Sequence, residues 1–128
     1  MLELPVDIYF VLVALFLGSF INLAVDRLPR GESLVTPRSH CRSCGRVLNV
    51  IDLLPVVGYF IRSGRCATCG TPIGLTAPLI EAGAGVLMLL SLVVFGVWVG
   101  SFVGLALIYI LAVVVLELAK RTAAASGR

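Results

Sequence analysis

The chain has 128 residues, of which 59% are hydrophobic and 13% charged, and its formal net charge is +3. Its mean hydropathy of +1.08 lies outside the range of soluble globular domains and excludes that class. The composition predicts an all-α integral membrane protein whose first partner is the lipid bilayer.

The first apolar stretch covers residues 8–25 and is long enough for a transmembrane helix. Residues 1–7 before it contain two acidic side chains and no basic one, and they are expected to form an external tail. The stretch is interrupted only by Ser19 and Asn22. Together with Asp26 these residues follow an i, i+3, i+7 spacing, which places all three on one helix face.

The loop expected over residues 26–77 contains all four cysteines of the chain, arranged as two C-x2-C-G knuckles: Cys41, Cys44, Cys66 and Cys69. Two such pairs direct four sulfurs at one tetrahedral ion, which predicts a zinc site. The glycines that follow, Gly45 and Gly70, suit a turn with positive φ and a close approach of the backbone. Four thiolates leave no open position for a catalytic water, so the zinc is predicted to be structural. The alternative is four free or redox-active thiols.

Between the knuckles, residues 47–61 are largely apolar. As a transmembrane helix this segment would place the two knuckles on opposite sides of the membrane. It is short for a span, contains Asp52 and Pro55, and has Arg46 and Arg62 at its ends. A segment that lies on the membrane interface and folds back over the zinc site is therefore favoured.

Residues 83–116 carry no charge over 34 positions. A straight helix of that length would measure about 51 Å against a hydrocarbon core of about 30 Å, so a break is expected. The glycines and tryptophan of residues 96–101 favour a turn there, with transmembrane helices over 78–98 and 101–118 and a tail over 119–128.

The repeat of Gly96, Gly100 and Gly104 could also be a packing stripe on a continuous helix. The length of the uncharged segment favours the turn over this alternative. About three spans are therefore expected, with the zinc-binding loop between the first two.

The basic residues predict the orientation. Seven of the ten lie in the loop over residues 26–77, and the other three follow the third expected span. The positive-inside rule then places the loop and the C-terminus in the cytoplasm and the N-terminus outside. A reducing cytoplasm disfavours disulfides among the cysteines, and the positive charge is explained without a nucleic-acid partner.

Several short motifs resemble the opening of the bacterial prepilin peptidases, in unbroken order over roughly residues 15–90. They are residues 18–22 (GSFIN), 27–33 (RLPRGES), 37–41 (PRSHC), 52–55 (DLLP), 64–70 (GRCATCG) and 78–81 (PLIE). The resemblance implies a location in the bacterial inner membrane. It also implies a role in cleaving and N-methylating type IV prepilins and the related pseudopilins of type II secretion, with S-adenosylmethionine as the methyl donor.

The sequence departs from that family at the protease residues. It has no G-x-G-D segment, its aspartates are Asp7, Asp26 and Asp52, and Glu117 stands in the stretch comparable to the family's first catalytic aspartate. The expected function is therefore a zinc-stabilised docking or accessory module in prepilin processing. Such a module would work with a separate peptidase subunit or by self-association. The alternatives are an S-adenosylmethionine-dependent N-methyltransferase of cleaved prepilins and a fragment of a complete aspartyl peptidase.

Three residues are candidates for chemistry at the membrane face: Glu81, Asn22 and Asp26. An acid near the start of a span, such as Glu81, is a functional candidate by default, although it could instead neutralise an arginine of the loop. For Ser19 and Asn22 a hydrogen bond between helices is favoured over catalysis. For Asp26 an ion pair with neighbouring arginines is favoured.

Overall fold

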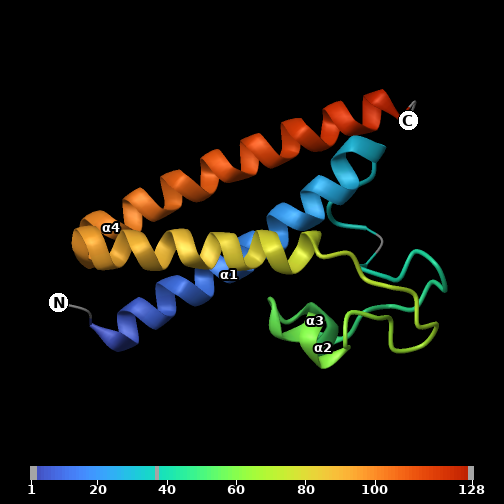
Figure 1. Ribbon diagram of the computed structural model, residues 1–128, viewed down its shortest axis with the longest axis horizontal. Coiled ribbons are helices and arrows are strands. Elements are labelled where there is room, and N and C mark those ends of the chain that lie inside the picture. Colours follow the sequence, from blue (N-terminus) through green and yellow to red (C-terminus); the bar gives the residue numbers. More distant parts are fainter. Residues whose placement is uncertain (1–2, 37, 127–128) are drawn as a thin grey trace.

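The computed structural model describes residues 3–36 and 38–126, and over these residues it contains helices and no strand. The elements in chain order are α1 (Leu4–Arg27), the 3-10 helix η1 (Leu28–Arg30), α2 (Val50–Leu53), α3 (Val57–Ile61) and α4 (Thr76–Ala125). Figure 1 shows α1 and α4 packed together, with the loop that carries α2 and α3 at one end. The predicted all-α class is confirmed for the described residues.

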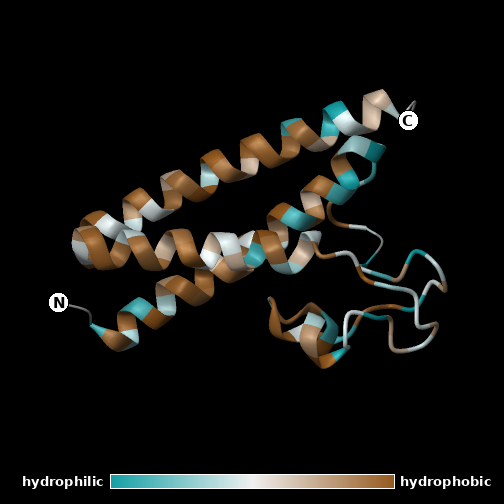
Figure 2. Ribbon diagram, in the orientation of Figure 1, coloured by the Kyte–Doolittle hydropathy of each residue, from teal (hydrophilic) through white to brown (hydrophobic). Residues whose placement is uncertain are grey.

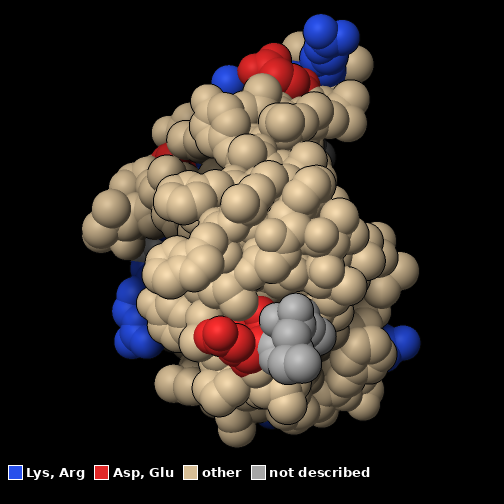
Figure 3. Space-filling view, turned by 90° about the vertical axis from the view of Figure 1, so that its left-hand side faces the viewer, with Lys and Arg blue, Asp and Glu red and all other residues tan. Residues whose placement is uncertain are grey.

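Two helical segments are long and apolar enough to cross a membrane, Leu4–Arg30 and Thr76–Ala125. Figure 2 shows hydrophobic residues along both of them, with the hydrophilic residues gathered mainly toward the loop end. Figure 3 views the opposite end, where uncharged side chains make up most of the surface. The outward faces remain apolar, and Trp98 is 84% exposed. Such faces suit contact with lipid.

The 50-residue helix α4 turns back on itself at Gly96, whose φ of 79° and ψ of 175° are not helical. Figure 1 shows the two halves running in opposite directions beside each other, with the turn far from the loop. Glycine adopts this positive φ without the steric cost that a side chain would bring. The break is at the first residue of the expected turn, while the division into spans 78–98 and 101–118 stays a prediction.

The other two glycines of the repeat allow the halves of α4 to approach closely. A Cβ at Gly100 would collide with the backbone of Ser91 and Leu92, and one at Gly104 would lie 2.6 Å from Met88 Sδ. The first glycine of the repeat therefore makes the favoured turn. The next two pack against the opposite half of α4, without the continuous helix that the alternative assumed.

The core lies where α1 meets α4. Its buried side chains are small or aliphatic: Ala14, Ile21, Ile80, Ala84, Met88, Leu92 and Ile108. Gly18 of α1 approaches α4 so closely that a Cβ there would lie 2.7 Å from the Cα of Glu81. This contact brings the polar face of α1 against Glu81.

Both long helices extend beyond the expected spans. α1 begins at Leu4, so part of the expected external tail 1–7 is helical. Pro5 in the first turn and Asp7 near the positive helix end favour this start. α4 continues to Ala125 through an alanine-rich segment with high helix propensity. Residues 1–2, 127–128 and Pro37 of the family-like motif lie outside the described residues.

The segment over residues 47–61 forms α2 and α3, which are four and five residues long. Neither could cross a bilayer, so the alternative of a transmembrane helix between the knuckles is wrong. Residues 54–56 join the two helices, and the last of them, Val56, has φ 60° and ψ −53°. A positive φ is uncommon for a β-branched residue and indicates local backbone strain.

Candidate functional site

The two cysteine knuckles have the same local structure. In the first, Cys41 N–H donates to Arg46 O and Gly45 N–H donates to Cys41 O, both at 2.8 Å. In the second, Cys66 N–H donates to Thr71 O at 2.9 Å and the glycine N–H donates back to Cys66 O at 3.1 Å. An antiparallel bridge flanks each knuckle. Each knuckle therefore holds its cysteine pair through its own backbone.

The predicted positive φ of the knuckle glycines is confirmed, with 76° at Gly45 and 72° at Gly70. The expected close approach is wrong, because a Cβ at either position would meet nothing within 4 Å. Backbone conformation alone therefore explains these glycines.

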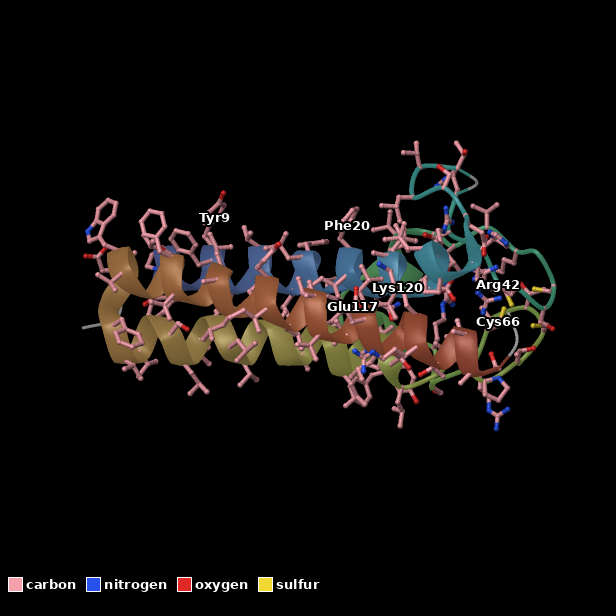
Figure 4. All side chains as sticks on the ribbon, turned by 90° about the horizontal axis from the view of Figure 1, so that it is seen from above. Tyr9, Phe20, Arg42, Cys66, Glu117 and Lys120 are labelled. Carbon is pink, nitrogen blue, oxygen red and sulfur yellow. The ribbon has the colours of Figure 1, made fainter. Side chains whose placement is uncertain are left out.

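The knuckles bring all four sulfurs within 4.8 Å of one another. Cys41 Sγ lies 3.7 Å from Cys69 Sγ, and Cys44 Sγ lies 3.8 Å from Cys66 Sγ. Figure 4 shows the sulfurs together at the loop end, near the labelled Cys66 and Arg42. His40 is outside this group and its Nδ1 lies 3.0 Å from Arg38 O, as expected for a cluster completed by cysteines. The four sulfurs could hold one metal ion.

The cysteine pKa values differ strongly across the cluster. Hydrogen bonds from the Thr71 hydroxyl and backbone lower the pKa of Cys69 to about 6. At Cys44 the Arg46 backbone N–H favours the thiolate, but desolvation and the neighbouring sulfurs outweigh it and raise the pKa to about 11. Adjacent thiolates repel one another unless a cation lies between them, which is the electrostatic condition of a metal site.

Arg42 ties the first knuckle to the end of α1. Its Nη2 donates to Asp26 Oδ2 at 2.6 Å and to Glu32 Oε1 at 3.0 Å. The hydrogen bond to Asp26 is the main reason why the pKa of Arg42 is raised. Asp26 also lies 3.7 Å from Arg30, so one of its two neighbouring arginines pairs with it as expected, whereas the other, Arg27, has no ion pair with it among the described residues.

Asp52 organises the segment between the knuckles. Its carboxylate accepts from Asn49 N–H at 2.9 Å and from Arg62 Nε at 2.6 Å, and it lies 2.9 Å from Arg46 Nη1. Burial by itself raises the pKa of Asp52, but the hydrogen bonds from Asn49, Arg62 and Arg46 outweigh it and lower the pKa. Asp26 and Asp52 therefore engage different arginines and are not a shared-proton pair.

Glu81 joins three parts of the molecule. It is 8% exposed, accepts from Ser19 Oγ–H at 2.8 Å, and accepts with its other oxygen from Val56 N–H. It forms no ion pair with an arginine among the described residues, so the expected neutralising role is not seen. Ser19 makes the bond between helices that was favoured for it.

A cavity of about 890 Å³ lies between the loop ends of the long helices and the knuckles. The three candidate residues Asn22, Asp26 and Glu81 all line it, and Cys41 and Cys66 lie on the loop side. This volume is within the range of small-ligand sites. The shared face of α1 predicts the grouping of Asn22 and Asp26, but not the cavity.

Two residues of the site are not among the candidates predicted from the sequence. Arg27 entered the predictions only as a basic residue of the loop and as the first residue of a family-like motif, yet it is 3% exposed and lines the cavity. Val56 was part of an apolar segment, and its strained backbone makes the bond to Glu81. The signals for Arg27 were its position directly after an apolar stretch and at the start of a family-like motif. The sequence carries no signal for the strained backbone of Val56.

Fold and site together define an α-helical protein with membrane-type helices and a loop whose four cysteines could hold a metal, beside a ligand-sized cavity. Residues 12–95 match the model of the family described as the bacterial peptidase A24 N-terminal domain, and the chain belongs to that family. The predicted resemblance to prepilin peptidases is thereby confirmed.

Curated relatives agree with this assignment. The chain is 36% identical over 89 residues to a prepilin leader peptidase/N-methyltransferase of Myxococcus xanthus, covering 70% of this chain and 27% of the relative. It is 44% identical over 73 residues to a protein of the same name from Burkholderia pseudomallei, covering 57% and 24%. For a Bacillus subtilis relative of that name, identity is 32% over 100 residues, covering 78% and 40%. The chain thus spans well under half of these relatives' lengths. No solved structure matches it significantly.

Proposed function

We propose that this chain is a zinc-stabilised module that docks type IV prepilins or pseudopilins during their processing at the bacterial inner membrane. The observation that carries the proposal is the cavity of about 890 Å³ where the loop ends of the long helices meet the cysteine knuckles. It is large enough for a short peptide segment and offers carboxylate, amide and apolar surface. The family and the names of the relatives supply the substrate class.

The sulfur geometry supports zinc as the metal. A tetrahedron with Zn–S bonds of about 2.3 Å has edges of about 3.8 Å. The cross-knuckle distances of 3.7 and 3.8 Å have this length. Four sulfur ligands complete the coordination, so the zinc would organise the loop and leave the chemistry to other groups.

The arrangement of charges supports a cytoplasmic loop and an external N-terminus, with α4 crossing the membrane twice. Figure 1 shows the N-terminus at the end opposite the loop and the C-terminal end of α4 at the loop end. The basic residues of the loop and Lys120 and Arg121 of α4 therefore gather at one end, as the positive-inside rule requires.

A second function, methyl transfer from S-adenosylmethionine to a cleaved prepilin, is favoured by the grouping of Glu81, Asn22 and Asp26 in one cavity. A carboxylate at the membrane face could orient the prepilin's N-terminal amine. Peptide cleavage is not assigned to these 128 residues, because they contain no G-x-G-D segment. Cleavage would come from a separate peptidase subunit or from the rest of a longer protein.

Docking can be tested by photocrosslinking in membranes that contain a prepilin of the source organism. A photoreactive residue at Leu23, which lines the cavity, should form a prepilin adduct. One at Trp98, exposed near the α4 turn, should form none. Equal adducts from both positions, or none from either, would overturn the docking function.

Methyl transfer can be separated from docking with labelled S-adenosylmethionine. If the chain is a methyltransferase, the cofactor should raise its melting temperature, and label should appear on a cleaved prepilin peptide. No thermal shift together with no labelled peptide would refute the enzyme and leave the docking module.

A further inference from the structure

Arg27 is the last residue of α1 and one of the most deeply buried charged groups described, at 3% exposure. Its Nη1 donates to Ser33 O at 2.9 Å. No carboxylate lies within ion-pair distance of it among the residues that the structure describes. A buried cation without a counter-charge is costly, so Arg27 requires an explanation.

The other arginines that line the cavity differ from Arg27, because each contacts a carboxylate. Arg30 and Arg42 contact both Asp26 and Glu32, with the shortest distance 2.6 Å. Arg46 and Arg62 contact Asp52 at 2.9 and 2.6 Å. Arg27 is thus the one guanidinium in the cavity wall, over residues 3–36 and 38–126, that lacks an acidic partner.

Helix carbonyls compensate part of this charge. Arg27 lies in the last turn of α1, where the unsatisfied carbonyls carry about half a negative charge. That fraction does not balance a full guanidinium charge in a buried position. The cavity beside Arg27 is large enough to admit a counter-ion.

We propose that Arg27 anchors an anion site in this cavity and that its ligand is a phosphate oxyanion. The planar guanidinium matches phosphate geometry and can donate two parallel hydrogen bonds to it. Arg27 also lies where the apolar stretch ends, which is the depth of lipid headgroups for a membrane-spanning α1. The phosphate can come from an anionic lipid or from a soluble phosphate compound. This inference is independent of prepilin docking.

The test uses the full zinc-loaded chain in nanodiscs made of phosphatidylcholine, with or without phosphatidylglycerol. Inorganic phosphate is titrated into the pure phosphatidylcholine samples. Native mass spectrometry counts retained lipids, and thermal unfolding measures stabilisation by each anion. The variants are R27Q, R27K and, as a matched control in the same cavity, R30Q, whose side chain is 40% exposed.

Wild type and R30Q should either retain phosphatidylglycerol or be stabilised by inorganic phosphate. Retention of phosphatidylglycerol identifies an anionic lipid as the source of the phosphate, and stabilisation by inorganic phosphate identifies a soluble compound. R27Q should bind the anion roughly tenfold or more weakly, and R27K should retain part of the binding. If R27Q fails to fold, R27K and the wild-type titrations still decide the outcome. No response of wild type to either anion, or an equal response of wild type and R27K at both sources, would overturn the proposal.

Discussion

At the scale of single residues, Glu81 has the most connections. Its two carboxylate oxygens accept from Ser19 of α1 and from Val56 of the loop, while its own backbone belongs to α4. Ser19 and Val56 both donate hydrogen bonds, and a carboxylate offers an acceptor oxygen to each of them. A neutral amide at this position would present a donor to one of them.

E81Q should therefore destabilise the protein by about 1–3 kcal/mol, because one donor would lose its acceptor in a buried site. S19A removes only one hydroxyl donor and should cost about 1 kcal/mol. Thermal unfolding in detergent would measure both. An E81Q protein as stable as wild type would contradict the proposed role of Glu81 as a three-way junction.

Asp52 should make the stability of the loop depend on pH. Its pKa is lowered in the folded state, so its contribution is present above the unfolded value of about 3.9 and is lost as pH falls through the folded value. D52N, which keeps the shape, should be less stable than wild type at pH 7 by about 1.5–3 kcal/mol, the range for hydrogen bonds to a charged group. The melting temperatures of both proteins should approach each other as the pH falls below the unfolded value of about 3.9. A constant difference across that range would show that charge is not the cause.

At the scale of elements, the hairpin inside α4 depends on small residues. Gly96 supplies the turn, and Gly100 and Gly104 let the returning half approach the first half. Ser91 and Ser101 near this turn donate to backbone carbonyls of their own helix and so remain satisfied in an apolar setting. Packing without side-chain bulk is the usual basis of helix association in membranes.

G100A should open this hairpin, because the new Cβ would meet the backbone of Ser91, which cannot rotate away. The expected cost is about 1–3 kcal/mol. G83A is the matched control, since its Cβ would meet only Leu111 Cδ2 at 4.0 Å and alanine favours a helix. Unfolding titrations of both variants provide the comparison, and equal stability would contradict the packing argument.

At the scale of the whole molecule, the loop is tied to the helices by a few polar contacts and organised by the cysteines. Arg42 links the first knuckle to Asp26 of α1, and Glu81 of α4 holds Val56. Exposed apolar residues such as Val50 and Phe60 show that α2 and α3 bury little surface in the chain. A metal would therefore supply much of the loop's order.

Metal analysis of the purified protein should give one zinc per chain, and C66S should lose most of it. Chelation should make the loop sensitive to protease, because binding free energies of about 10–16 kcal/mol would be withdrawn from it. The helical circular dichroism of α1 and α4 should change little, since their core contains no cysteine. A zinc content near zero in the untreated protein would contradict the zinc assignment.

The features that the sequence determined by itself are local. Apolar length predicted a helix before the loop and a broken helical stretch after it, and knuckle spacing predicted the sulfur cluster. The positive φ of Gly45 and Gly70 followed from the same motif. The helices and the knuckle turns depend on neighbours within a few residues, where composition and spacing act directly on the backbone. The meeting of the two knuckles spans 22 and 28 positions and was predicted from the four ligands that one tetrahedral ion requires.

The tertiary structure decided what depends on distant contacts. Glu81 meets Ser19 across 62 positions and Val56 across 25, and no periodicity encodes those meetings. The burial of Arg27 and the cavity likewise arise only when the ends of α1 and α4 pack beside the loop. Side-chain partners and burial follow from packing between elements, whereas local spacing decides the elements themselves.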